Sequence, residues 1–98
     1  MSYAIVLQFD GVSEEQYWAV NEALGIDRGF TTGLPDGLQV HTAGPIGDGG
    51  WLVSEVWRSK DAQETFMATR LGEALGGVGV PPPVQVLDTE TVSFEIRD

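Results

Sequence analysis

The stretch that decides the fold is residues 37–66, GLQVHTAGPIGDGGWLVSEVWRSKDAQETF. Its apolar and β-branched residues predict one strand over residues 37–43 and another over residues 51–58. The glycine-rich segment between them contains Asp48-Gly49, a strong hairpin-turn signal. Ser59 then provides a good N-cap for a helix. The stretch therefore predicts a β-hairpin followed directly by a helix.

Upstream of the hairpin, residues 3–10 (YAIVLQFD) predict a further strand that ends at Gly11. Strand side chains alternate between the two faces of a sheet. One face of this strand carries Ile5, Leu7 and Phe9, and the other carries Ala4, Val6 and Gln8. Both faces are mostly apolar, which is typical of a strand that is covered on both sides.

A helix is expected after this strand, beginning at Ser13. Gln16 lies three residues further on, which is the spacing of a capping box. Helical periodicity places Tyr17, Val20 and Leu24 on the inward face, and Gly25 is a suitable stop. Residues 26–36 follow as a loop.

After residue 59 the second helix is expected to run to about Leu75 and to stop at Gly76-Gly77. Three prolines make residues 78–83 an extended connector. Residues 84–88 and 91–96 predict the last strand. The order is βαββαβ, so residues 1–98 predict a single α+β domain with a ferredoxin-like fold: a four-stranded antiparallel sheet with two helices on one face.

The other face of such a sheet would be bare, although its strands are apolar on that side too. An exposed apolar face of this size indicates an interface. The simplest solution is a homodimer in which two open sheet faces pack together. Pairing would also suit a chain of 98 residues, which can bury only one thin core.

Composition excludes several classes of function. Five Lys and Arg residues against 15 Asp and Glu give a formal net charge of -10, which argues against nucleic acid and anionic membrane partners. Cysteine is absent, so thiolate chemistry and cysteine-ligated metals are excluded. No apolar run approaches the length of a membrane span, and the start does not resemble a signal peptide. A cytoplasmic location is expected.

The residues also resemble a known group of proteins. The matching pieces are Pro35-x-Gly37-Leu38, His41-x-Ala43-Gly44-Pro45, Gly50-Trp51, Glu55-Val56-Trp57-x-Ser59, Phe66 and Arg70-Leu71. With the βαββαβ order, the chain is similar to the dimeric α+β-barrel proteins of the antibiotic biosynthesis monooxygenase-like superfamily, and to its small, mostly uncharacterised bacterial members.

The resemblance implies a substrate pocket between the sheet and the two helices of each subunit. The superfamily includes cofactor-independent quinone-forming monooxygenases, polyketide cyclases, haem-degrading enzymes, haem-dependent dismutases and members without demonstrated activity. Fold alone does not decide among these functions.

Two strands carry residues that suit chemistry. On residues 51–58 the two-residue period puts Trp51, Glu55 and Trp57 on one face, and on residues 37–43 it puts Gln39 and His41 on one face. If the two faces coincide, an imidazole and a carboxylate converge among aromatic rings. That combination suits a flat, aromatic, partly ionisable ligand.

The second helix has an unusual cation. Its inward stripe is expected to contain Phe66, Met67, Leu71 and Ala74, and Arg70 and Gln63 lie inside that stripe. A buried cation needs a carboxylate or a ligand anion. A buried Glu55–Arg70 ion pair is the structural interpretation, and a ligand anion at Arg70 is the functional one.

The preferred hypothesis is a homodimeric, cofactor-independent monooxygenase or cyclase that acts on a small aromatic or polyketide-like molecule. His41, Glu55 and Arg70 are the predicted catalytic residues. The predicted substrate-binding residues are Gln39, Trp51, Trp57, Tyr17, Phe66 and Met67. No cofactor is expected, because the substrate supplies the electrons, and a single histidine without cysteine makes a transition-metal site unexpected.

Two alternatives remain open at this point. One is a non-catalytic dimeric protein that binds a small hydrophobic ligand. The other is a structural domain in which His41 is a core or interface histidine and the aromatic residues only pack. Gly44 to Gly50 joins two strands, so it lacks the helix N-terminus that a phosphate-binding loop requires.

Overall fold

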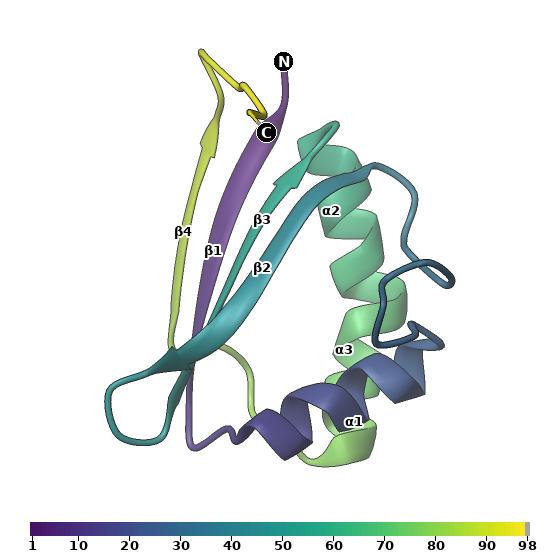
Figure 1. Cartoon of the computed structure of the whole chain (residues 1–98), viewed down its shortest axis with the longest axis vertical. Helices are drawn as coiled ribbons and strands as arrows, with labels where there is room; N and C mark the ends of the chain where they lie inside the picture. Colours follow the sequence, from purple (N-terminus) through teal and green to yellow (C-terminus); the bar gives the residue numbers. More distant parts are fainter. Residues whose placement is uncertain (98) are drawn as a thin grey trace.

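The computed structural model describes residues 1–97. Its elements in chain order are β1 (Tyr3–Asp10), α1 (Glu14–Leu24), β2 (Leu38–Ile46), β3 (Gly50–Trp57), α2 (Lys60–Phe66), the π-helical turn η1 (Met67–Leu71), α3 (Gly72–Val78) and β4 (Gln85–Glu90). The sheet is antiparallel with strand order β2-β3-β1-β4. All helices lie on one face of it (Figure 1). The predicted ferredoxin-like βαββαβ fold is confirmed.

The core lies between the sheet and the helices. Every second residue of β1 and β3 is buried on the helix side, as the two-residue period predicts. Trp57 is fully buried, and its ring lies 5.4 Å from that of Phe66 on α2. Burying one such side chain stabilises the fold by about 1.5–3 kcal/mol, so the aromatic pair anchors α2 to the sheet.

Local signals set the bounds of α1. The Ser13 side chain accepts a hydrogen bond from the Gln16 backbone, and the Gln16 side chain accepts one from the Ser13 N–H. This is the predicted capping box. Gly25 adopts the left-handed conformation at the helix end, also as predicted.

The second helical segment runs past its predicted end. The expected stop at Gly76-Gly77 is wrong, because α3 continues to Val78 and Gly79 provides the left-handed cap. Leu75 and Val80 are buried on either side of this end. Packing of these two residues outweighs the cost of about 1 kcal/mol for each glycine inside a helix.

The last strand is shorter than predicted. β4 covers only Gln85–Glu90, and residues 91–96 form no strand. The reason is the register: Glu90 pairs with Tyr3, the first residue of β1, and only Met1 and Ser2 precede it. Ser2 O accepts the bond from the Thr91 N–H. β1 therefore offers no further ladder for residues 91–96 to join.

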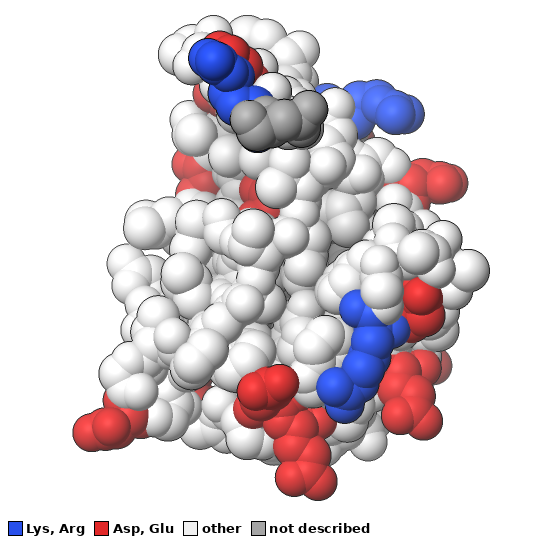
Figure 2. Space-filling model, in the orientation of Figure 1, with Lys and Arg blue, Asp and Glu red and all other residues white. Residues whose placement is uncertain are grey.

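The sheet face turned away from the helices is partly apolar, and Gln8, Thr42 and Ser54 add polar side chains to it. Val56 has Ala4 and Val40 as its cross-strand neighbours, and Val6 faces Leu87. Leu87 is 60% exposed. In Figure 2 charged side chains lie around the periphery of the view, and most of its central surface is uncharged. Among residues 1–97, no helix is long and apolar enough to cross a membrane.

Candidate functional site

His41 and Glu55 face each other across the β2–β3 hairpin. They are direct partners in the register, and both point to the helix side of the sheet. The pair lies in the regular part of the hairpin register, which runs from Val40–Val56 to Ile46–Gly50, and a β-bulge precedes it between Leu38 and Val40. The convergence of the imidazole and the carboxylate, which the sequence left open, is therefore observed.

The same bulge moves Gln39 away from His41. Leu38 takes the position on the helix side and packs against the core. Gln39 is exposed instead and accepts a hydrogen bond from the Ser2 hydroxyl at 2.7 Å. The expectation that Gln39 and His41 share a face is wrong, since it assumed a regular strand.

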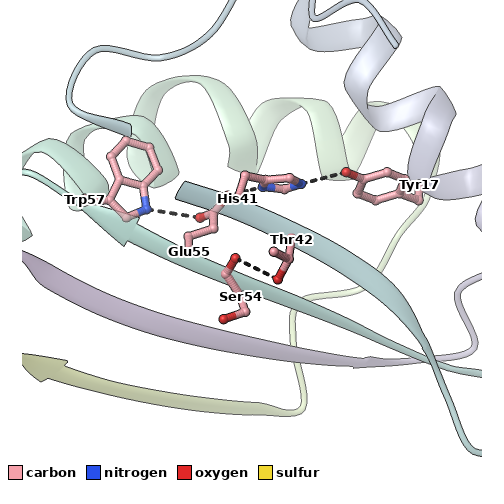
Figure 3. Close-up of polar contacts among 6 residues, drawn as sticks. All are labelled: Tyr17, His41, Thr42, Ser54, Glu55 and Trp57. Atoms are coloured by element: carbon pink, nitrogen blue, oxygen red, sulfur yellow. Dashed lines mark hydrogen bonds and ion pairs between the residues drawn. The ribbon is translucent and has the colours of Figure 1, made fainter. Parts of the chain in front are cut away.

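A continuous chain of hydrogen bonds passes through His41 (Figure 3). The Tyr17 hydroxyl of α1 lies 2.6 Å from His41 Nε2, and His41 Nδ1 lies 2.7 Å from Glu55 Oε2. Trp57 Nε1 donates to the other carboxylate oxygen, Glu55 Oε1, at 3.1 Å. The four side chains come from α1, β2 and β3, so the chain of bonds joins the sheet to the helix layer.

Donor and acceptor chemistry assigns the protons in this chain. An ionised Glu55 only accepts hydrogen bonds, so neutral His41 must carry its proton on Nδ1. His41 Nε2 is then the acceptor for the Tyr17 hydroxyl. The side chains of His41 and Glu55 are 15% and 8% exposed, so the arrangement is largely shielded from water. It is the geometry of a proton relay.

The environment of Tyr17 favours its neutral form. Burial raises the pKa of Tyr17, and the negative charge of Glu55 raises it further. The Asn21 side chain acts in the opposite direction, although the Asn21 amide nitrogen has no hydrogen bond of normal geometry. Tyr17 is therefore a neutral hydroxyl group, which donates a hydrogen bond to His41 Nε2.

A small cavity that is partly open to the surface adjoins this relay. It has a volume of about 60 Å³ and lies between the sheet and the helices. Its wall is mostly apolar, and the polar residues on it are Tyr17, Asn21, His41 and Trp51. Asn21 Nδ2 and Trp51 Nε1 are buried donors without a partner among residues 1–97. Unpaired buried donors are rare and need an explanation.

Asn21 was missed by reasoning from the sequence. It is 6% exposed and lies one turn beyond Tyr17 on α1. The available signal was its place beside the inward stripe of Tyr17, Val20 and Leu24, where a polar amide is unexpected.

A second hollow opens the site to the surface. It has a volume of about 300 Å³ and shares Tyr17, His41 and Trp51 with the inner cavity. Its outer wall includes Trp18 and Phe30. The Phe30 ring stacks on His41, with centroids 5.0 Å apart. We call this surface hollow the outer groove.

Arg70 does not join the site. The expected Glu55–Arg70 ion pair is wrong, because Glu55 is bonded to His41 and Trp57. Arg70 Nη2 donates instead to the backbone oxygens of Leu24 and Gly33, at 2.9 and 3.0 Å. Backbone carbonyls satisfy this partly buried cation in place of a carboxylate.

Three of the other predicted residues lie behind the cavity wall. Trp57 donates a hydrogen bond to Glu55, and Phe66 packs on the Trp57 ring. Met67 packs against the core. Only Tyr17 and Trp51 of the predicted aromatic residues line the cavity. Among residues 1–97, no group of three or more His, Asp or Glu side chains has an arrangement that could hold a metal ion.

No protein-family model matches the chain, and no curated protein matches its sequence. Solved structures do match over nearly the full length. A candidate antibiotic biosynthesis monooxygenase from Chloroflexus aurantiacus J-10-fl has 12% identity and a TM-score of 0.66, with 97% of each chain covered.

Two further matches are oxygenases of Streptomyces. SnoaB of Streptomyces nogalater, a cofactor-independent oxygenase, has 13% identity and a TM-score of 0.62, with 95% of each chain covered. The ActVA-Orf6 monooxygenase of Streptomyces coelicolor, solved in complex with nanaomycin D, has 17% identity and a TM-score of 0.63, with 99% of this chain and 93% of the other covered. At these identities the likeness concerns the backbone, and the chain has the fold of the antibiotic biosynthesis monooxygenase-like proteins.

Proposed function

We propose that the chain is a cofactor-independent oxygenase of small phenolic aromatic molecules. The observation that carries this proposal is the pair of unpartnered buried donors, Asn21 Nδ2 and Trp51 Nε1, beside the Tyr17–His41–Glu55 relay. Both residues also line the inner cavity, and a phenolate or quinone oxygen bound there would accept from a donor that turns toward it. Leaving such groups unpaired costs about 1–3 kcal/mol each, so a ligand oxygen would recover that energy.

The size of the site agrees with a flat ligand that enters from the surface. The inner cavity is smaller than the roughly 300–1,000 Å³ typical of ligand pockets. The outer groove adds about 300 Å³ and shares three wall residues with the cavity. An aromatic ligand would span both spaces, with its reacting oxygen near Tyr17 and its rings against Trp51.

The relay would act as the general base. Tyr17 takes the proton of the substrate while its own proton moves to His41 Nε2, and Glu55 stabilises the imidazolium that results. Asn21 and Trp51 hold the phenolate oxygen through their N–H groups. The electron-rich anion is then the species that reacts with O2.

The reaction balances without a further reductant. Anthrone, whose enol tautomer is a phenol, loses a proton to the relay, and its anion transfers one electron to O2. The radical pair forms a C–O bond, and the relay returns the proton to the peroxide. Loss of water from this hydroperoxide gives anthraquinone. One anthrone and one O2 therefore become one quinone and one water.

The assembly belongs to the same proposal. Two copies would pack their open sheet faces together, because Val6, Val56 and Leu87 leave an apolar surface there. Stable interfaces bury about 1,200–2,000 Å² in total. A covered sheet would also make the core rigid beneath His41 and Glu55.

The test is O2 consumption with anthrone, measured with an oxygen electrode and corrected for the uncatalysed rate. We expect Trp51→Phe and Asn21→Ala to lower kcat/KM by about 10–100-fold, since each removes one donor to the developing anion. Thr69→Ala is the control for the loss of a donor. Thr69 lines neither the inner cavity nor the outer groove, and its hydroxyl donates to Thr65 O at 2.6 Å, so this variant should keep the wild-type rate.

Binding is measured separately with alizarin, a flat phenolic quinone, by quenching of tryptophan fluorescence. Binding without O2 consumption would indicate a non-catalytic ligand-binding protein. Absence of both would leave a structural role and overturn the proposal.

A further inference from the structure

The loop between α1 and β2 is tied to the second helical segment by one side chain. Arg70 Nη2 donates to Leu24 O at the end of α1 and to Gly33 O nine residues further along. The last carbonyls of a helix lack partners within the helix, and a cation near them is favourable. α1 has no basic residue in its own last turn, so Arg70 supplies this cation from η1.

Arg70 occupies a π-helical turn. η1 spans Met67–Leu71 between α2 and α3, and such turns insert one extra residue into a helix. The Arg70 guanidinium also lies over the Phe66 ring, 5.4 Å from its centroid. Phe66 thus fixes the direction in which Arg70 reaches the loop.

The loop itself is internally braced. The Asp27 carboxylate accepts hydrogen bonds from the backbone and hydroxyl groups of Thr31 and Thr32. Hydrogen bonds from the Thr31 side chain and the Thr32 backbone lower the pKa of Asp27 to about 2. Gly33 lies against Gly25 so closely that a Cβ at Gly33 would be 2.1 Å from the Gly25 oxygen. These contacts tie residues 25–33 together as one unit.

Phe30 stands at the centre of this unit in an uncommon backbone conformation. Its φ is 55°, and it is the only non-glycine residue among those described with a positive φ. A bulky residue there is an outlier that its surroundings must hold in place. The ring stacks on His41, so the conformation directs Phe30 at the relay.

Two hollows of the surface share Phe30 and His41 in their walls. One is the outer groove, and the other has a volume of about 160 Å³ and is also lined by Leu34 and Leu38. The stacked Phe30 ring therefore lies where both hollows reach the imidazole.

We infer that Arg70 is a positioning residue that holds the loop so that Phe30 covers His41 and controls access to the relay. Arg70 acts through the Leu24 and Gly33 carbonyls and does not touch the relay itself. The consequence for a ligand rests on the proposed function. The covering of His41 does not, and it is testable without any ligand.

The test uses the fact that His41 is the only histidine. Diethyl pyrocarbonate reacts with neutral imidazole, so its rate reports access to His41, and mass spectrometry confirms the modified residue. Phe30→Ala and Arg70→Met should each react at least about fivefold faster than the wild type at the same pH, because loss of the cover opens the imidazole to solvent. Arg70→Lys should restore a slower rate.

Asp36→Ala is the matched control. Asp36 is an exposed residue of the same connection, and it lines neither hollow at His41. Its variant should react at the wild-type rate. Circular dichroism and thermal melting verify that each variant is folded. Folded Phe30→Ala or Arg70→Met with the wild-type rate would overturn the inference.

Stopped-flow quenching by alizarin separates this inference from the proposed function. In Arg70→Met both the association and the dissociation rate should rise, with a smaller change in Kd. If the wild type does not bind alizarin at all, the proposed function loses support. Faster His41 modification in the variants would still establish the positioning role.

Discussion

His41 and Glu55 are direct cross-strand partners, and their side chains meet at 2.7 Å on the buried side of the sheet. Glu55 is also the acceptor for Trp57 Nε1. The Glu55 carboxylate thus holds both the Trp57 indole and the His41 imidazole by hydrogen bonds. Glu55 sets which nitrogen of the His41 ring carries the proton, and with it the role of Tyr17 as donor.

Glu55→Gln should separate stability from activity. The amide oxygen can still accept from Trp57, but the amide nitrogen can only donate to His41 Nδ1. His41 must then carry its proton on Nε2 and can no longer accept from Tyr17. We expect little change in the free energy of unfolding and a loss of about 10²-fold in anthrone oxidation. Urea denaturation and O2 consumption measure the two effects.

Glu55→Ala should instead unfold more easily, by about 1–3 kcal/mol for each donor that it leaves unpaired. Glu95→Gln is the control for loss of a negative charge. Glu95 is 72% exposed at its side chain, so its variant should match the wild type in both assays. A Glu55→Ala chain as stable as the wild type would contradict the relay.

The two tyrosines predict a loss of stability at high pH. Burial, and then the hydrogen bond to Asp88 at 2.5 Å, raise the pKa of Tyr3, and burial raises the pKa of Tyr17. Above pH about 10 the unfolded chain releases these protons while the native chain keeps them. The unfolded state then binds fewer protons, so the free energy of unfolding falls as pH rises.

Ultraviolet absorbance of tyrosinate measures this effect, because the chain has only two tyrosines. Neither should ionise at its ordinary pH while the fold persists. Tyrosinate should appear together with the loss of helical circular dichroism. Tyr3→Phe should weaken the decline in stability. Free titration of both tyrosines in the folded chain at pH about 10 would be the opposite result.

Periodicity in the sequence predicts the part of the site that lies on regular strands. The alternation along β3 correctly places Trp51, Glu55 and Trp57 on one buried face. Gln39 could not be placed in this way. Nothing in Leu38-Gln39-Val40 marks a bulge, since no glycine or proline interrupts the run. The pairing with β3 decides it, and that is a tertiary effect.

The partner of Arg70 is also invisible in the sequence. Reasoning from side chains looks for a carboxylate, and Glu55 was the obvious choice. The structure uses two backbone oxygens, which every residue carries and no pattern reveals. Phe30 escaped notice for a related reason, because it lies in a loop without periodicity and its place depends on the turn around Asp27.

Gly33 should be the least replaceable glycine of the loop. It combines a φ of 77° with a Cβ position only 2.1 Å from the Gly25 oxygen. Gly33→Ala is therefore expected to destabilise the fold by more than about 1 kcal/mol. Gly47→Ala is the matched control, because Gly47 also has a positive φ but open space around it. Thermal melting should show a clearly larger loss for Gly33→Ala. Equal losses would mean that the close approach of the two loop ends is unimportant.

The apolar sheet face predicts association that one charge should prevent. Val56 lies at its centre between Ala4 and Val40, so Val56→Asp would place a carboxylate inside the proposed interface. A buried unpaired charge costs several kcal/mol, and we expect the dimer to dissociate at micromolar concentration. Sedimentation equilibrium measures the mass. Thr65→Asp, on the exposed outer side of α2, is the control and should remain dimeric. A monomeric wild type would contradict the proposed dimer. A dimeric Val56→Asp chain would show that the interface lies elsewhere than on the open sheet.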